Sequence, residues 1–252
     1  VIDATADACS PTEDCTVLEI GPGIGTLTRS LAARYKRVIA LEVDRSLIPV
    51  LRYTLEDCPN VTVVNEDVMQ TDLPALLAEA FAAGSVAVCA NLPYYITTPI
   101  LMKLLESRLP FSGITVMVQA EVADRLCAGA GEKAYGAITA VLNYYARAEE
   151  ILFVPADRFV PAPKVNSKVI RITLWQEKPC VPRDEALLFR TVKAAFGQRR
   201  KTLANALATG YPELGKERVS KILADMGLAA DIRGERLSIA DFTALSDRIG
   251  EA

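Results

Sequence analysis

The tetrapeptide Asn91-Leu92-Pro93-Tyr94 combines residue types that suit the methylation of an amine on an aromatic ring. It follows the apolar run 86–90, which is typical of a buried strand, and precedes a helical pattern. The Asn91 side-chain oxygen and a backbone carbonyl held by Pro93 can accept hydrogen bonds from an amino group, and the Tyr94 ring can stack on a base. The tetrapeptide therefore predicts methyl transfer to the exocyclic amine of a nucleobase.

A glycine-rich turn lies about seventy residues upstream of this tetrapeptide. The apolar run 17–20 leads into Gly21, Gly23 and Gly25, and an amphipathic stretch follows. Glycines let the backbone approach a ligand closely, and the positive end of the following helix favours polar groups. The glycines could instead make only a tight turn, but three within five residues after an apolar strand favour a ligand. Their G-x-G-x-G spacing differs from the dinucleotide fingerprint G-x-G-x-x-G.

Acidic residues follow two further apolar runs. Glu42 comes directly after the run 38–41, and Asp67 follows the run 61–64. Because the carboxyl ends of parallel strands meet at one edge, where such folds bind ligands, we expect the glycine turn, both acids and Asn91 to lie together. An acid at the end of the second strand suits ribose hydroxyls. Considered alone, either acid could equally be an ordinary surface residue.

Three more segments extend this series of motifs along the chain. They are 117–125 (MVQAEVADR), 159–167 (FVPAPKVNS) and 195–203 (AFGQRRKTL). With the glycine turn and the tetrapeptide, they resemble the bacterial small-subunit ribosomal RNA adenine dimethyltransferases, the KsgA family of class I S-adenosylmethionine-dependent methyltransferases. The resemblance covers nearly the whole chain.

The resemblance implies an activity and its partners. S-adenosylmethionine would donate methyl groups to the 6-amino groups of two adjacent adenines near the 3′ end of 16S ribosomal RNA, each methylated twice. The substrate would be a partly assembled small subunit, so the enzyme would also take part in ribosome assembly. The implied enzyme is a cytoplasmic monomer that requires no metal and contacts no membrane.

The resemblance also implies roles for individual residues. Gly21 would pack against the cofactor, Asn91 would bridge cofactor and target, and Phe159 would help to clamp the target base. Glu42 would hold the ribose and Asp67 would contact the cofactor adenine. The full expected cofactor site is Glu19, Gly21, Gly23, Gly25, Glu42, Asp67, Val68 and Asn91, and the expected catalytic residues are Asn91, Leu92, Pro93, Tyr94 and Phe159.

Two aromatic residues near the expected site can also be interpreted as packing residues. A phenylalanine in a proline-rich loop, such as Phe159, is more often a packing anchor, and we expect Tyr95 to pack inward.

Family members usually begin with a basic segment ending in a G-Q-N-F-L motif that closes over the cofactor. The chain begins at Val1 without it, so we expect an upstream segment to complete the site.

The charge distribution bears on RNA binding. The chain of 252 residues has a net charge of −3 and a pI near 5.3, which disfavours general attraction to phosphates. Between Arg183 and Lys221, however, nine basic residues outnumber four acidic ones. A basic helical segment is more often a solvated face. The cluster Arg199-Arg200-Lys201 belongs to a family-like motif and predicts an RNA-binding site instead.

The coarse pattern predicts a Rossmann-like sheet and a helical C-terminal domain. Strands alternate with helical patterns through about residue 125, and the runs 150–154 and 168–174 predict an antiparallel pair that closes a mostly parallel sheet. A further helix is expected at 136–147. Prolines near residue 180 indicate a boundary between a catalytic domain over 1–178 and an all-α RNA-binding domain over 179–252.

Composition argues against several classes of protein. The chain has no histidine, and its six cysteines form no C-x-x-C pair, which disfavours a zinc site or a disulfide framework and suits a reducing cytoplasm. Charges interrupt every candidate membrane span. A nicotinamide-dependent dehydrogenase would need a histidine or a Y-x-x-x-K motif, and the sequence contains neither.

Two alternative functions remain open. Methyltransferases that modify large-subunit RNA and confer macrolide resistance share the N-terminal motifs, but their C-terminal region lacks the R-R-K-T-L pattern found at 199–203. A ribosome-assembly factor could act mainly by binding RNA. The intact Asn91 and Tyr94 favour catalysis over a role in binding alone.

Overall fold

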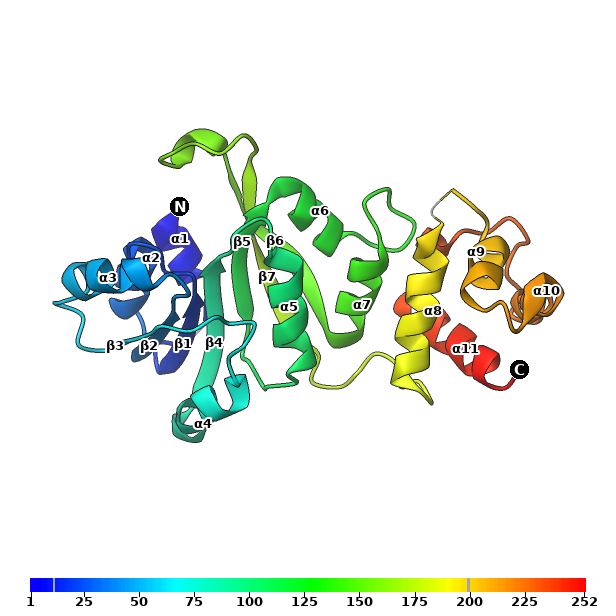
Figure 1. Cartoon of the computed structure of the whole chain (residues 1–252), viewed down its shortest axis with the longest axis horizontal. Coiled ribbons are helices and arrows are strands. Elements are labelled where there is room, and N and C mark those ends of the chain that lie inside the picture. Colours follow the sequence, from blue (N-terminus) through cyan, green and yellow to red (C-terminus); the bar gives the residue numbers. More distant parts are fainter. Residues whose placement is uncertain (11, 199) are drawn as a thin grey trace. The chain divides into compact units, whose positions relative to one another are not determined.

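The computed structural model describes residues 1–10, 12–198 and 200–252, which form two compact units. One unit, here called the sheet unit, contains Val1–Ala123 and Ala146–Leu174. The other, here called the helical unit, contains Asp124–Tyr145 and Trp175–Ala252. Figure 1 follows the chain through both units from the N-terminus to the C-terminus.

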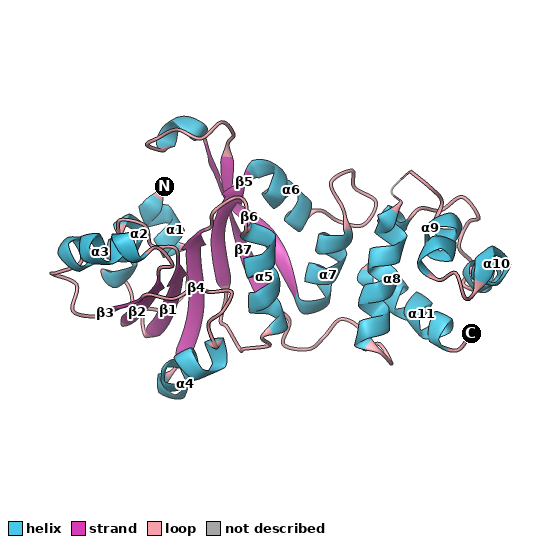
Figure 2. Ribbon diagram, viewed as in Figure 1, coloured by secondary structure: helices cyan, strands magenta, loops and turns pink. Residues whose placement is uncertain are grey.

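The strands of the sheet unit form one sheet in the order β3-β2-β1-β4-β5-β7-β6 (Figure 2). Strands β1 to β5 are parallel, and β7 runs antiparallel to both β5 and β6. This confirms the expected Rossmann-like, mostly parallel sheet with its antiparallel pair. The strands are β1 (Cys15–Ile20), β2 (Arg37–Leu41), β3 (Val61–Val64), β4 (Ser85–Asn91), β5 (Ile114–Gln119), β6 (Ala146–Val154) and β7 (Ser167–Leu174).

Helices flank this sheet because its central strands are apolar on both faces. Every residue of β1 is buried, as are residues 86–90 of β4, which is the pattern of a parallel strand covered on each side. The helical segments are α1 (Ile2–Asp7), α2 (Thr26–Ala32), η1 (Arg45–Leu47), α3 (Ile48–Thr54), α4 (Leu73–Ala83), α5 (Thr97–Glu106) and η2 (Ala156–Arg158). The division between the units falls within α6 (Ala120–Cys127).

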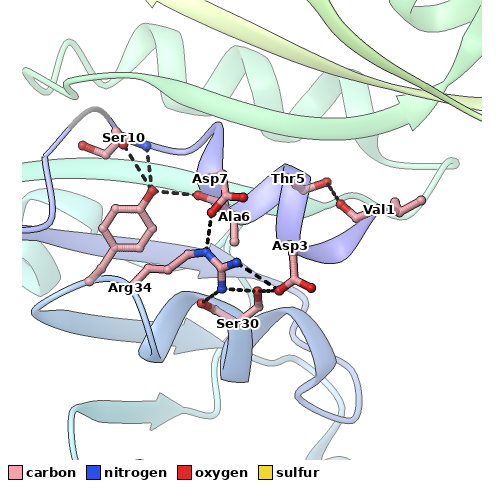
Figure 3. Close-up of polar contacts among 9 residues, drawn as sticks. Val1, Asp3, Thr5, Ala6, Asp7, Ser10, Ser30 and Arg34 are labelled. Carbon is pink, nitrogen blue, oxygen red and sulfur yellow. Dashed lines mark hydrogen bonds and ion pairs between the residues drawn. The ribbon is translucent and has the colours of Figure 1, made fainter.

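Polar contacts attach helix α1 to the rest of the sheet unit (Figure 3). The Arg34 guanidinium pairs with Asp7 at 2.5 Å and with Asp3 at 3.1 Å. The Tyr35 hydroxyl donates to the Ala6 carbonyl at 2.7 Å and accepts from the Ser10 N–H at 3.1 Å. These bonds join α1 to the segment between α2 and β2, so the short helix does not depend on its own weak helix-forming tendency.

The helical unit contains α7 (Ala137–Tyr145), α8 (Glu185–Gly197), α9 (Leu203–Gly210), α10 (Gly215–Asp225), η3 (Gly234–Arg236) and α11 (Ile239–Gly250). Its core includes Leu188 and Val192 of α8, as their shared helical face predicts, together with Leu207 and Phe242. Ser238 begins α11 with a capping box that it forms with Asp241.

The helical unit also takes in residues 124–145, which the expected boundary assigned to the catalytic domain. Tyr144 and Ala140 of α7 are buried in the same cluster as Leu188 and Phe242. The Tyr135 hydroxyl donates to the Leu237 carbonyl at 3.0 Å. A helical pattern specifies an apolar face but not its partner, so α7 packs with helices that come much later in the chain.

The described residues contain no feature of a membrane span, a metal site or a disulfide framework. None of their helices is long and apolar enough to cross a membrane. They contain no group of three or more histidine, cysteine or acidic side chains arranged to hold a metal ion. All six cysteines are free thiols.

Candidate functional site

The carboxyl ends of β1, β2, β3 and β4 bring the expected site residues to one edge of the sheet. Ile20 is in register with Leu41, and Leu41 with Val64, so the segments after these strands emerge side by side. Strand β4 lies on the other side of β1 and ends at Asn91. The direction of strand order reverses between β1 and β4, and open α/β sheets bind ligands at such a point.

The glycine turn after β1 leaves open space at this edge. Gly21, Gly23 and Gly25 have φ values of 70°, 59° and 90°, which other residues rarely adopt. A Cβ atom at Gly21 or Gly23 would meet nothing within 4 Å, whereas one at Gly25 would lie 3.1 Å from the Thr54 hydroxyl. The first two glycines therefore form an open cradle for a ligand, and Gly25 allows α2 to pack against α3.

The Glu42 carboxylate is fixed between two loops. It is buried, and its oxygens accept hydrogen bonds from the backbone N–H groups of Gly23 at 3.2 Å and Asp44 at 2.8 Å. The Asn65 amide donates to the Glu42 carbonyl at 2.7 Å. Each carboxylate oxygen can accept a further hydrogen bond, so Glu42 suits a pair of ligand hydroxyl groups.

The Glu19 carboxyl group lies near the glycine turn and is 1% exposed. Among the described residues, neither Glu19 Oε2 nor the buried Thr28 hydroxyl has a partner at hydrogen-bonding distance and angle. Burial raises the pKa of Glu19 to about 7; the nearby Thr28 hydroxyl opposes this shift, and the Glu42 carboxylate adds to it. A buried carboxyl group with an unpartnered oxygen beside an open cradle suits a polar or cationic ligand group.

Asp67 and Val68 lie after β3, next to an open hollow. Asp67 is half-buried, and its carboxylate accepts a hydrogen bond from the Met69 N–H at 2.8 Å. Val68 is buried. A hollow of about 580 Å³ is lined by Asp67, Gln70 and Thr71, among other residues. The turn thus combines a fixed acid with an apolar neighbour.

The Asn91-to-Tyr94 segment leaves β4 in a fixed conformation. Asn91 is exposed, and the Leu92 N–H donates to the Met117 carbonyl at 3.1 Å. The Pro93 carbonyl accepts from the Ile96 N–H at 3.2 Å, so it faces the turn that begins α5. The half-buried Tyr94 shares a 2.8 Å hydrogen bond between its hydroxyl and Ser167 Oγ. Its ring is thereby held while part of it stays accessible.

Phe159 and Tyr95 differ in their environments. Phe159 is half-buried and packs against a cluster of Met117, Val154 and Val169, and Met117 is the register partner of Asn91. It belongs to the loop between β6 and β7, which projects beyond the sheet in Figure 1. The expectation that Tyr95 packs inward is wrong, because this side chain is 86% exposed. Its backbone lies in a turn, where no alternating pattern determines which way a side chain points.

The expected RNA-binding residues belong to the helical unit. Arg200 and Lys201 are exposed in the connection between α8 and α9. The Lys201 N–H donates to the Gln198 carbonyl at 2.9 Å, which shapes the turn. Arg199 lies outside the described residues.

Sequence reasoning missed two supporting residues. Ser167 anchors the Tyr94 hydroxyl, although it was recognised only as the last residue of the 159–167 motif. Asn65 holds the backbone that follows Glu42. An asparagine directly after a strand is a signal that could have pointed to Asn65, but the pairing of Ser167 with Tyr94 spans 73 positions and has no local signal.

Comparisons with known proteins agree with this geometry. Residues 1–249 match the family model described as ribosomal RNA adenine dimethylase. The chain is 48% identical to the ribosomal RNA small subunit methyltransferase A of Bacillus licheniformis, over 100% of this chain and 87% of that protein. It is 44% identical to the protein of the same name from Alkaliphilus oremlandii, over 100% and 88% of the two chains.

Two solved structures share the fold. The 23S rRNA methyltransferase ErmE superposes with a TM-score of 0.73 at 26% identity, over 99% of this chain and 96% of that one. A dimethyladenosine transferase from Plasmodium falciparum gives a TM-score of 0.76 at 24% identity, over 97% and 93%. The matched family model spans almost the whole chain, and this protein therefore belongs to the ribosomal RNA adenine dimethylase family.

Proposed function

We propose that this enzyme uses S-adenosylmethionine to dimethylate the 6-amino groups of two adjacent adenines near the 3′ end of 16S ribosomal RNA. The observation that supports this most directly is the fixed Asn91-to-Tyr94 segment beside the open glycine cradle. The 48% identity to a small-subunit methyltransferase favours this substrate over large-subunit RNA. The enzyme would act as a monomer on small subunits in the cytoplasm and contribute to their assembly.

The residues at the sheet edge fit the cofactor. Gly21 and Gly23 leave room for it, and the fixed Glu42 carboxylate can accept from both ribose hydroxyls. Glu19 offers an unpartnered carboxyl oxygen, Oε2, to its cationic portion, while Asp67 and Val68 suit the adenine. When bound, S-adenosylmethionine supplies an electrophilic methyl group.

Asn91 orients the amine that accepts the methyl group. Its side-chain oxygen and the Leu92 carbonyl would accept the two amine protons, because the Pro93 carbonyl is already bonded within the turn. The amine lone pair is conjugated with the ring, and these acceptors favour tetrahedral nitrogen as positive charge develops on it. The methylated nitrogen is strongly acidic, so it can release its proton to water without a side-chain base.

Tyr94 and Phe159 position the target base. The Tyr94 ring, anchored through Ser167, offers a face for stacking, and Phe159 can close on the base from the β5 side. A base reaches such a site only after it leaves its stack, which favours an unpaired loop adenine. Holding both reactants in line supplies much of the rate enhancement.

The proposed function is tested by incubating the enzyme with tritiated S-adenosylmethionine and unmethylated small subunits, with large subunits in parallel. The RNA is digested and its nucleosides are separated. We expect label in dimethyladenosine from 16S RNA. Label only in large-subunit RNA would support the resistance-type activity, and tight subunit binding without label would support an assembly factor.

Replacing Asn91 tests the assigned role. We expect Asn91→Ala to lower the transfer rate by about 100-fold or more, because an acceptor for the developing charge is lost, and to leave binding of small subunits unchanged. Single-turnover transfer and filter binding measure the two quantities. Gln176→Ala, which removes an exposed amide elsewhere, is the matched control. A wild-type rate in Asn91→Ala would contradict the role.

A further inference from the structure

We propose that the groove between α8 and α9 of the helical unit binds an unpaired nucleotide of ribosomal RNA. This inference rests on the proposed function and extends it, because it assigns an RNA contact to a site distinct from the methylation site. The groove has a volume of about 340 Å³. That volume is at the small end of the range for ligand pockets and suits a single base.

Four alanines and glycines form an apolar floor without long side chains in the groove. The lining includes Ala194 and Gly197 from α8, and Ala206 and Gly210 from α9. The two helices approach so closely that a Cβ atom at Gly210 would lie 2.4 Å from the Ala194 Cβ. At Gly197 a Cβ atom would meet nothing within 4 Å, so this position opens into free space. A planar base can lie on such a floor without displacing side chains.

Arg190 provides a fixed planar cation at the groove. Its guanidinium carbon lies 4.2 Å from the centroid of the Tyr211 ring. Its Nη2 donates to the Gly210 carbonyl at 3.0 Å and to the Glu213 carboxylate at 2.9 Å. The side chain remains 51% exposed. Because the guanidinium is already ordered, a base can stack on it at little entropic cost.

The remaining polar groups suit a nucleotide. Among the described residues, the exposed Lys193 has no hydrogen bond or ion pair, so it is free to contact a phosphate. Gln198 Nε2 donates to the Thr209 hydroxyl at 3.2 Å, and both groups could bond to the edge of a base. In the sequence, Arg199, Arg200 and Lys201 come after Gln198 and extend the positive charge along the chain.

This charge pattern favours RNA over a peptide. Cations surround an apolar floor, and the nearby acid, Glu213, is already paired with Arg190. Stacking on a flat surface beside cations is the usual arrangement for single-stranded nucleic acid. A ribosomal protein segment would be identified by binding that survives digestion of the RNA.

Two variants test the two parts of the proposal: one fills the groove, and the other removes the Lys193 cation. Gly197→Leu would occupy the groove from a position with open space, and Gly197→Ala is the control for the same backbone change. Lys193→Ala removes the phosphate contact, and Lys221→Ala removes an exposed cation of the same unit outside the groove. Binding of the full chain to unmethylated small subunits is measured by filter binding at several salt concentrations, with folding checked by thermal unfolding.

We expect Gly197→Leu to weaken binding about 5- to 100-fold, because base stacking is lost, while the salt slope stays unchanged. We expect Lys193→Ala to weaken binding and to reduce the slope by about 0.7 to 1. Both control variants should bind like the wild type.

Three outcomes would overturn the inference. Wild-type binding by a folded Gly197→Leu variant that still methylates 16S RNA would refute the groove alone and leave the proposed function intact. Absence of any binding by the wild-type chain to small subunits, or binding that survives nuclease treatment, would refute RNA as the occupant. Methylation by the Gly197→Leu variant therefore separates failure of the groove from failure of the proposed function.

Discussion

The Glu19 carboxyl group is buried at the edge where the cofactor is proposed to bind, and its pKa is raised to about 7. Between pH 4.5 and 7 the folded state keeps a proton that the unfolded state releases, so the free energy of unfolding falls as pH rises through this window. The shift corresponds to about 3 kcal/mol. We expect Glu19→Gln to remove this dependence, as measured by urea unfolding without cofactor.

The control for this prediction is Glu56→Gln, which changes an exposed acid. It should keep the wild-type dependence on pH, since other titrating groups are common to all three proteins. The free energy of unfolding of Glu19→Gln should equal that of the wild type near pH 4 and exceed it near pH 8. If the free energy of unfolding changed with pH in the same way for the wild type and Glu19→Gln, Glu19 would be ionised in the folded protein, which would contradict the prediction.

At the level of single residues, the sequence predicted the groups that carry chemistry better than those that support them. Asn91 and Glu42 were found because each follows an apolar run, and the carboxyl ends of parallel strands meet. Ser167 and the exposed Tyr95 were not predicted. A side-chain partner far along the chain, or the direction of a side chain in a turn, depends on tertiary structure that periodicity does not describe.

At the level of elements, the contact between α8 and α9 requires glycine at position 210. We expect Gly210→Ala to lower the free energy of unfolding by about 1 to 3 kcal/mol, because the new Cβ would overlap the Ala194 Cβ, which lies 2.4 Å away. This exceeds the gain of up to about 1 kcal/mol from better helix propensity. Urea unfolding of the variant measures the difference.

A second substitution identifies the cause of that loss. Ala194→Gly should recover part of the stability in the Gly210→Ala background, because it removes the overlapping atom. Gly197→Ala, where the new atom meets nothing within 4 Å, should not destabilise the protein. Equal losses at positions 197 and 210 would attribute the effect to the helix backbone rather than to the contact.

The strands that are buried on both faces were predicted more accurately than the partly exposed edge strand. Strands β1, β2 and β4 were found as apolar runs because they are covered on both faces. Strand β6 begins at Ala146, before the expected residue 150, because this edge strand mixes exposed and buried positions. Helix α7 was predicted, but its packing with the C-terminal helices was not.

At the level of the whole molecule, the net charge conceals a difference between the units. The sheet unit has 13 basic and 18 acidic residues, giving −5, and the helical unit has 15 and 13, giving +2. The sum is the −3 of the chain. An acidic pI is therefore compatible with RNA binding when the phosphate contacts come from the helical unit.

The basic cluster at 199–201 should account for much of the salt dependence of subunit binding. Each phosphate contact that is lost lowers the slope of log affinity against log salt by about 0.7 to 0.9, so replacing Arg199, Arg200 and Lys201 by alanine should lower it by about 2 to 3. The triple variant of Lys216, Arg218 and Lys221 makes the same charge change at exposed positions of α10. If only net charge mattered, both variants would lose affinity equally. A larger change in slope for the 199–201 variant would assign the phosphate contacts to that connection, whereas an unchanged slope for that variant would place the RNA surface elsewhere on the molecule.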